Sequence, residues 1–291
     1  MEAFGLCARA ERLPDRLQDW LMEPKLDGVR VHVRAGGGRV DVMTRRGQRF
    51  NGRLPRIESR LESLELVLDG EVVWFDRSGQ VDFHHGSGLF RAEPTLSLRR
   101  QLAEGPLVLM AWDILSLAGN DLRGLPIEER REVVAKLVEI LELDELRLVD
   151  QVPASPEAQA YFVSVYHEGV VLKRRGSAYP RGRGGSWLKL KEVFDEDVVI
   201  MGLVEGKNSL TGTTGAVAFG QYRDGVLVQR GTCSGMDDRT RHDLWANFPE
   251  RYESRVLVIR HMGHDGAGFR HPQWQYLRPL DDKAPEECLW T

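Results

Sequence analysis

The sequence predicts an α+β protein with two domains, in which antiparallel sheets with flanking helices precede a smaller barrel of strands. The length of 291 residues suits two domains of ordinary size. Residues 1–192 mix helix and strand patterns, whereas residues 193–291 hold short strands at close spacing between glycine-rich turns. Several short strands with one helix are typical of a small closed barrel such as the OB-fold.

The first domain has a pattern for each expected element. A hairpin is expected over 29–34 and 40–44, across the glycines at 36–38. A strand is expected at 64–75, with an interruption at Asp69-Gly70, and another at 107–115, which should be buried on both faces. Two further strands are expected at 169–174 and 186–190, on either side of a loop at 177–185. Helices are expected at 53–64, at 127–141, with acids in its first turn, and from Ser155-Pro156 onward.

The second domain reads as strands with one helical interruption. Strands are expected at 193–204, 216–222, 226–233 and 255–262, and a helix at 237–247. We place the domain boundary between residues 192 and 193.

Composition excludes several classes of protein. Hydrophobic residues make up 42% and charged residues 29%, as in folded globular chains. No apolar run approaches the roughly 20 residues of a membrane span, and the charged N-terminus does not resemble a secretion signal. The three cysteines, Cys7, Cys233 and Cys288, are too few and too scattered for a disulfide framework or a zinc cluster. We therefore expect a cytoplasmic monomer with no membrane partner.

Charge is distributed unevenly. The net charge of −4 is not the overall signature of a nucleic-acid binder. Residues 173–191 nevertheless contain lysines and arginines and no acid. This local excess is able to hold several phosphates, although a solvated basic face is an equally good reading.

The segment EPKLDGVR, residues 23–30, is the most informative motif. Lys25 comes directly before an Asp-Gly turn, so its side chain is held on a short, stiff segment. In a pocket this amine would be a positioned nucleophile, and on the surface it would belong to an ordinary hairpin. The common phosphate and metal signatures GxxxxGK[ST], HExxH and paired CxxC are absent.

Five further charged motifs lie on or beside expected strands. They are TRRGQ (44–48), LDGEVV (68–73), AWDIL (111–115), EGVVLKR (168–174) and WLKLK (187–191). Strand side chains alternate between faces, so Lys189 and Lys191 share one face. Each motif alone has a structural explanation, but their order and spacing together point to one functional site.

With these motifs in this order, the chain resembles the ATP-dependent DNA ligases of the covalent nucleotidyltransferase superfamily. The resemblance covers nearly the whole chain and implies a nucleotidyltransferase (adenylation) domain at 1–192 and an OB-fold domain at 193–291. The stretch from Ala111 to Glu132 resembles the DNA ligase form of that region. Residues 268–288 resemble the C-terminal motif, but with extra residues between Arg278 and Lys283.

The resemblance implies a three-step reaction with ATP as the AMP donor and nicked duplex DNA as the partner. Lys25 would take AMP from ATP, the 5′-phosphate at a nick would take it next, and a 3′-hydroxyl would displace it. A free lysine is almost wholly protonated at neutral pH. Cationic neighbours such as Lys189, Lys191 and Arg30 would favour its neutral, nucleophilic form and would also bind phosphates. Asp27 is implied in the later steps.

The other site residues also take their roles from the resemblance. Glu23 and Lys173 would contact the adenine base, and Trp112 would stack on it. Glu71 would contact the ribose or a metal, and Glu168 would bind Mg²⁺ or Mn²⁺. The remaining assignments are Arg45 to the nick or phosphates, Arg278 and Lys283 to the ATP phosphates, and Arg181 and Arg183 to DNA.

Three alternatives remain at this level. An RNA ligase would share the core chemistry, a non-catalytic nucleic-acid-binding relative would keep only the scaffold, and an NAD-dependent ligase would use another adenylate donor. Only 24 residues precede Lys25, so we expect a minimal two-domain form. A role in DNA repair, recombination or replication is left open.

Overall fold

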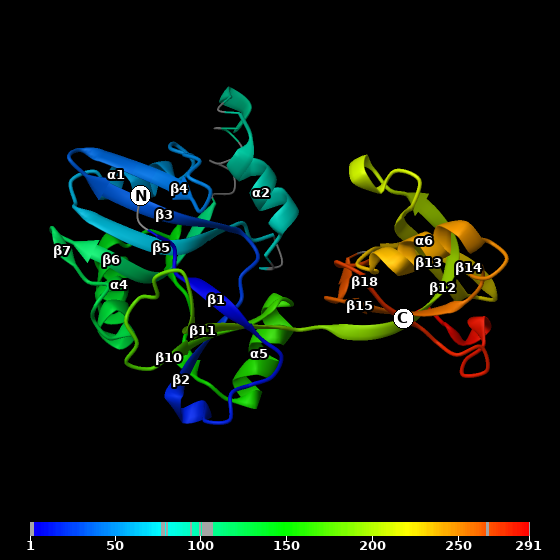
Figure 1. Ribbon diagram of the computed structural model, residues 1–291. Coiled ribbons are helices and arrows are strands. Elements are labelled where there is room, and N and C mark those ends of the chain that lie inside the picture. Colours follow the sequence, from blue (N-terminus) through cyan, green and yellow to red (C-terminus); the bar gives the residue numbers. More distant parts are fainter. Residues whose placement is uncertain are drawn as a thin grey trace. The chain divides into compact units, whose positions relative to one another are not determined.

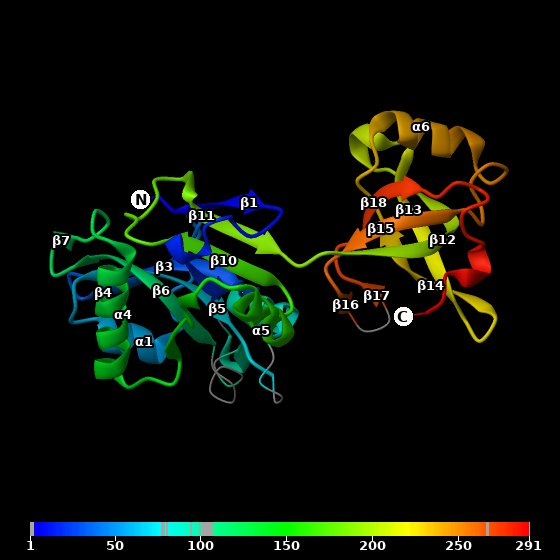
Figure 2. The same ribbon diagram turned by 90° about the horizontal axis from the view of Figure 1, so that it is seen from below.

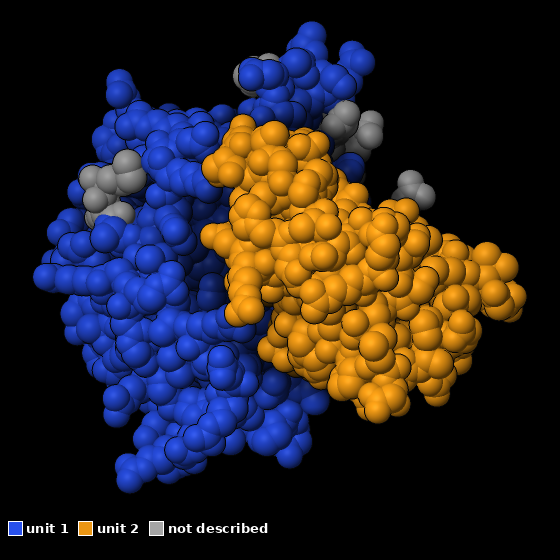
Figure 3. All heavy atoms as spheres, turned by 45° about the vertical axis from the view of Figure 1, so that its right-hand side comes forward, with its two compact units in different colours: residues 1–191 blue, residues 192–291 orange. Residues whose placement is uncertain are grey.

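The computed structural model describes residues 3–76, 79, 81–93, 95–98, 100, 107–265 and 268–290. The chain divides into two compact units, Met1–Lys191 and Glu192–Thr291 (Figure 3). The boundary expected from the sequence lies one residue further along the chain. Each unit has its own hydrophobic core.

Unit 1 contains two mainly antiparallel sheets (Figures 1 and 2). The first has the order β1-β11-β10-β2-β9, and only β1 and β11 are parallel. Its strands are β1 (Leu6–Ala10), β2 (Trp20–Pro24), β9 (Val152–Pro153), β10 (Gly169–Arg174) and β11 (Arg183–Lys191). Helix α5 (Pro156–Tyr166) packs on β2 and β10 and buries Phe162 against Met22 and Leu172. Ser155 caps this helix by accepting a hydrogen bond from the amide of Ala158, which confirms the expected start.

The second sheet of unit 1 has the order β4-β3-β5-β6-β7, with β8 pairing in parallel with β6. Its strands are β3 (Val29–Gly36), β4 (Arg39–Thr44), β5 (Leu66–Val73), β6 (Val108–Leu117), β7 (Asn120–Asp121) and β8 (Leu146–Leu148). The helices against it are α1 (Pro55–Leu61), α2 (Phe83–Arg91) and α4 (Ile127–Leu141). A short 3₁₀ turn, Leu17–Asp19, precedes β2.

Strand β5 differs from the prediction of an interruption at Asp69-Gly70. The strand runs unbroken from Leu66 to Val73. Its register with β6 shifts at this point, because Asp69 pairs with Asp113 whereas Gly70 pairs with Ala111. The close approach explains the glycine, since a Cβ on Gly70 would come 2.6 Å from the carbonyl oxygen of Met110.

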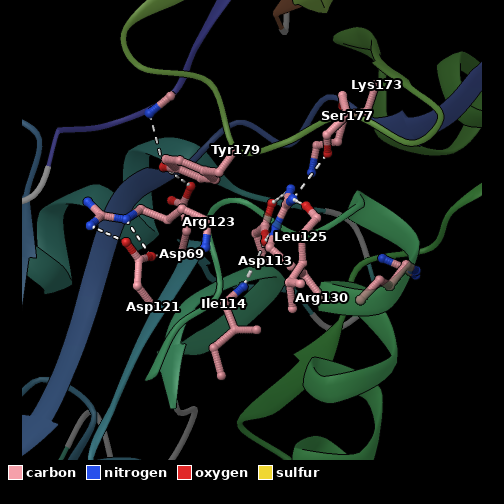
Figure 4. Close-up of polar contacts among 12 residues, drawn as sticks. Asp69, Asp113, Ile114, Asp121, Arg123, Leu125, Arg130, Lys173, Ser177 and Tyr179 are labelled. Carbon is pink, nitrogen blue, oxygen red and sulfur yellow. Dashed lines mark hydrogen bonds and ion pairs between the residues drawn. The ribbon is translucent and has the colours of Figure 1, made fainter. Parts of the chain in front are cut away.

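A buried ion pair joins helix α4 to strand β6. Arg130 lies on α4, and its Nε and Nη2 donate to the two oxygens of Asp113 at 2.7 and 2.9 Å (Figure 4). Both side chains are almost fully buried, so the bidentate geometry is needed to offset the loss of hydration. Asp113 in the AWDIL motif therefore has a structural role.

Unit 2 is built on a five-stranded antiparallel sheet with the order β14-β13-β12-β15-β18. Its strands are β12 (Phe194–Glu205), β13 (Thr214–Arg223), β14 (Val226–Cys233), β15 (Val256–His261) and β18 (Gln273–Leu277). Smaller elements are helix α6 (Asp238–Asn247), the pair β16 (His264–Asp265) and β17 (Gly268–Phe269), and 3₁₀ turns at Asn208–Leu210 and Pro285–Glu287. A parallel bridge between Ser234 and Gln273 joins the end of β14 to β18, the two outer strands of the sheet. None of the described helices is long and apolar enough to cross a membrane.

Candidate active site

A cleft of about 200 Å³ opens between the two sheets of unit 1. Strands β1, β2, β10 and β11 contribute to one wall, and β3, β5 and β6 to the other. The structure brings together in its lining most of the site residues expected from the sequence: Glu23, Lys25, Arg30, Arg45, Glu71, Trp112, Lys173, Arg183 and Lys189. Leu6 and Cys7 of β1, which the sequence did not single out, also line it.

Lys25 lies on the segment that crosses from one sheet to the other. Strand β2 ends at Pro24 in the first sheet, and β3 begins at Val29 in the second. The hairpin interpretation of EPKLDGVR is therefore wrong, because β2 and β3 do not pair. Gly28 is required here, since a Cβ would collide with the carbonyl oxygen of Val72.

The Lys25 amine is held by a buried carboxylate. Its Nζ donates to Oε1 of Glu168 at 2.6 Å, and the Nζ of Lys191 lies 3.4 Å from the same oxygen. Glu168 is only 3% exposed, so this contact is screened little by solvent. The backbone amide of Lys25 also donates to Gly169, next to Glu168. Lys25 is thus fixed at both its backbone and its amine.

Lys189 shows the effect of crowding among cations. Partial burial, followed by the positive charges of Lys191 and Lys25, lowers the pKa of Lys189 below that of a free lysine. The sequence predicted an influence of cationic neighbours on Lys25, and the structure places such an influence on Lys189. Lys189 thus lines the cleft beside other positive charges, and its amine is able to donate hydrogen bonds there.

Glu23 is a buried residue in the lining of the cleft. Its Oε1 accepts a hydrogen bond from Nε2 of Gln151 at 2.7 Å, and its Oε2 lies 2.8 Å from Nζ of Lys173. Lys173 is 1% exposed and its Nζ lies 5.4 Å from the ring centre of Trp112. Sequence reasoning missed Gln151, because it stands just before the two-residue strand β9, which pairs with β2.

Arg30 is fixed by a buried network. Its Nε and Nη2 donate to Asp69 at 3.0 and 2.6 Å, and its Nη1 donates to the carbonyl oxygen of Gly5 at 2.6 Å. The Tyr179 hydroxyl donates to Asp69 at 2.8 Å, as Figure 4 shows, and accepts from the amide of Gly5. Burial opposes the charge on both Arg30 and Asp69, but their pairing raises the pKa of Arg30 and lowers that of Asp69.

Glu71 is a partly buried carboxyl in the lining of the cleft. Its pKa is raised to about 8, chiefly by burial and also by nearby Asp69 and Asp27, against the opposing effect of Arg30 and Lys25. The described residues contain no cluster of three or more metal-ligating side chains. Glu71 and Glu168 therefore offer a sparse set of oxygen donors.

Three of the arginines differ in their surroundings. Arg45 follows β4, is exposed and lines the cleft. Arg183 was expected in a loop, but it opens strand β11, lines the cleft and donates to the carbonyl oxygen of Cys7 at 2.8 Å. Arg181 is exposed in the short segment before β11 and is not part of the lining.

The remaining predicted residues, Arg278 and Lys283, belong to unit 2. Arg278 Nε donates to Oδ1 of Asp197 at 2.7 Å, and Lys283 Nζ donates to Oδ2 of the same residue at 2.8 Å.

Comparison with known proteins assigns this arrangement to a family. The model of the ATP dependent DNA ligase domain matches residues 6–191, which include every residue that lines the cleft. The chain belongs to the ATP-dependent DNA ligase family. Residues 6–191 cover nearly all of unit 1, so the ligase domain and this unit coincide.

Two curated relatives from the ligase family are longer than this chain. The multifunctional non-homologous end joining protein LigD of Pseudomonas aeruginosa is 34% identical over 211 residues, which cover 70% of this chain and 24% of that protein. A probable DNA ligase of Streptomyces griseus is 32% identical over 241 residues, which cover 77% of this chain and 46% of that protein. The chain thus spans less than half the length of these relatives.

Solved structures of DNA ligases share the fold. A Lig E DNA ligase, described as binding DNA with a minimal scaffold, matches with a TM-score of 0.73 at 18% identity, over 96% of this chain and 100% of that chain. A mycobacterial DNA ligase D complexed with ATP and MES matches with a TM-score of 0.58 at 25% identity, over 100% of this chain and 98% of that chain. The mixed α+β architecture with antiparallel sheets predicted from the sequence is confirmed.

Proposed function

We propose that the protein is an ATP-dependent DNA ligase that joins a 5′-phosphate to a 3′-hydroxyl at nicks in duplex DNA. The proposal is carried by the position of Lys25, whose side chain lines a cleft with several cations, a tryptophan and a buried glutamate, in a chain of this family. AMP would move from ATP to Lys25 and then to the 5′-phosphate. The 3′-hydroxyl would finally displace it.

In the first step, Lys25 Nζ attacks the α-phosphorus of ATP. An N–P bond forms while the P–O bond to the pyrophosphate leaving group breaks. The amine must first lose a proton, and the positive charge of Lys191, which lies 3.4 Å from the same Glu168 oxygen as Lys25, would favour that loss. Lys189 and Arg183 line the same cleft and would stabilise the charge that develops on the phosphate oxygens.

The adenine base would lie against Trp112, with Glu23 and Lys173 at its edge. Stacking on an aromatic ring contributes on the order of 1 kcal/mol beyond area burial. A carboxylate acceptor fits the amino group of adenine, whereas the oxygen at the same position of guanine would be repelled by it.

Glu71 and Glu168 would hold a divalent cation, magnesium or manganese. Magnesium is commonly bound by one or two carboxylates together with substrate phosphates, so a magnesium ion here would need oxygen atoms of ATP as further ligands, because the described residues contain no group of three or more metal-ligating side chains. The ion would neutralise charge on the phosphates. Because the pKa of Glu71 is raised to about 8, cation binding should displace a proton from it.

Unit 2 is proposed to be an OB-fold domain at 193–291 that follows the nucleotidyltransferase domain at 1–192. The five-stranded sheet and the bridge that joins its outer strands support this proposal. Arg278 and Lys283 are proposed to bind the ATP phosphates. Asp27 is proposed to act in the later steps, and Arg45, Arg181 and Arg183 on the nicked DNA. The monomeric state and the cytoplasmic location stay predictions.

Among the cellular roles left open, end joining in DNA repair is favoured by relatives that are named non-homologous end joining proteins. The chain covers 24% and 38% of the length of these two relatives.

Incubation with ATP and magnesium tests the function directly. We expect one AMP adduct by mass measurement, which disappears when nicked duplex DNA is added. Lys25→Ala should form no adduct, whereas Lys191→Ala, the matched removal of a lysine on the same carboxylate, should keep a reduced yield. Adduct formation by Lys25→Ala would refute the assignment.

The same experiment separates the alternatives. Parallel chases with nicked DNA, nicked RNA and a hybrid duplex distinguish a DNA ligase from an RNA ligase. A folded protein that binds nicked DNA but forms no adduct would be a non-catalytic relative.

A further inference from the structure

Arg278 and Lys283 share one carboxylate although several residues separate them. Asp197, on strand β12, accepts from Arg278 Nε through one oxygen at 2.7 Å and from Lys283 Nζ through the other at 2.8 Å. The two cationic groups are therefore held on either side of a single carboxylate. This contact lies wholly within unit 2.

The fold of unit 2 explains how the long spacing is accommodated. Arg278 directly follows β18, and its amide donates to the carbonyl oxygen of Val256. Beyond Lys283, the chain is tied to β13 by hydrogen bonds between Tyr222 and both Cys288 and Trp290. Between these anchors the chain turns outward, and Leu280 is 80% exposed. The extra residues of the motif thus form an outward turn and do not separate the two charges.

The cations keep donors available while they are paired. The side chains of Arg278 and Lys283 are 30% and 28% exposed, whereas that of Asp197 is only 13% exposed. An ammonium has three donors and a guanidinium five, so Asp197 uses a minority of them. Nη1 of Arg278 donates a hydrogen bond to Asp282 at 2.7 Å. Phosphate oxygens are thus able to reach both cations without displacing Asp197.

Asp197 is well suited to hold this pair. Burial would raise its pKa, but the hydrogen bonds from Arg278 and Lys283 hold it below the ordinary value of an aspartate. Asp197 therefore stays ionised at neutral pH and keeps two like charges adjacent that would otherwise repel each other.

We propose that Asp197 is a positioning residue that sets Arg278 and Lys283 as one binding pair for two adjacent phosphates, the β- and γ-phosphates of ATP. The inference rests on the proposed function and deepens it, because these phosphates leave as pyrophosphate in the first step. Two cations at a fixed separation match a diphosphate better than two independent, flexible side chains, because less side-chain entropy is lost on binding.

The test is Asp197→Asn in the full chain, which keeps the size and removes the charge. We expect the KM for ATP in lysine adenylation to rise about tenfold, as is typical when a residue that orients a ligand-binding group is lost. We expect kcat to change much less. Inhibition by added pyrophosphate should weaken by a similar factor, and sealing of a pre-adenylated nick should be spared because that substrate carries no β- or γ-phosphate.

Asp195→Asn is the matched control, because Asp195 lies on the same strand and pairs with a different arginine, Arg260, at 2.6 Å. It should leave the KM for ATP unchanged. An unchanged or lower KM for ATP in Asp197→Asn would overturn the inference, and so would an equal loss in sealing pre-adenylated nicks. If the wild type forms no AMP adduct, the proposed function fails instead, so the two failures are distinguishable.

Discussion

Replacement of Glu71 by glutamine should stabilise unit 1 in alkaline solution while it impairs transfer of AMP. The folded structure raises the pKa of Glu71 from 4.5 to about 8, chiefly by burial. Below pH 4.5 the carboxyl is protonated in both the folded and the unfolded chain. Between pH 4.5 and about 8 only the unfolded chain ionises, so the folded state loses stability as the pH rises.

The size of this effect follows from the shift. Each unit of pKa corresponds to about 1.4 kcal/mol, so the full shift amounts to roughly 3–5 kcal/mol of lost stability. Glutamine does not titrate, so the variant escapes this loss. The difference in free energy of unfolding between Glu71→Gln and the wild type should be nearly flat below about pH 4, should grow in favour of the variant up to about pH 8, and should level off above that.

Urea denaturation at pH 5, 7 and 9, followed by tryptophan fluorescence, measures this difference. Glu168→Gln is the matched control, because Glu168 already carries a paired charge with Lys25 and Lys191. Its loss leaves two cations without their partner and should destabilise the protein at pH 7. A difference between Glu71→Gln and the wild type that does not change with pH would refute the reasoning.

Two further predictions concern the walls of the cleft. Arg181→Ala should weaken the binding of nicked DNA and reduce its salt dependence, and it should leave adenylation unchanged. Arg183→Ala should also slow adenylation, because the Arg183 side chain lines the cleft. Filter binding at several salt concentrations measures DNA binding and the AMP adduct assay measures adenylation, and identical results for the two variants would contradict this distinction. Gln151→Leu should raise the KM for ATP, because one oxygen of Glu23 loses a hydrogen bond whose net contribution is about 1–2 kcal/mol. The rate of sealing of pre-adenylated nicks should stay within a few fold of the wild-type rate. An unchanged KM for ATP would show that Glu23 does not need this hydrogen bond.

Much of the secondary structure was predictable because it depends on local signals. Helix α4 has the expected bounds, and α5 begins at the expected cap, since amphipathic spacing and capping residues act within a few positions. Strands β1 and β2 were missed. Strand β1 is stabilised by pairing between Leu6 and Arg183, far apart in the sequence, and has no strong alternation of its own.

The charged side chains that line the cleft were predicted from the sequence, whereas the contacts that hold them were not. The motifs named the side chains that line the cleft, but the partners that hold them come from distant segments. Gln151 holds Glu23, Tyr179 supports Asp69, and Asp197 joins Arg278 to Lys283. Each partner is an ordinary polar residue in the sequence and becomes significant only through pairing that the fold creates.

The crossing segment at Lys25 shows why a short motif can specify a site. Residues 25–28 connect two sheets whose facing walls form the cleft, so chain connectivity places Lys25 there. Gly28 permits the close approach to Val72 that starts β3, and β3 then carries Arg30 into register opposite Glu71. The lysine, the glycine and the arginine of EPKLDGVR thus have three linked roles: the amine is the proposed nucleophile, the glycine allows the turn into the second sheet, and the arginine supports the wall that faces the amine.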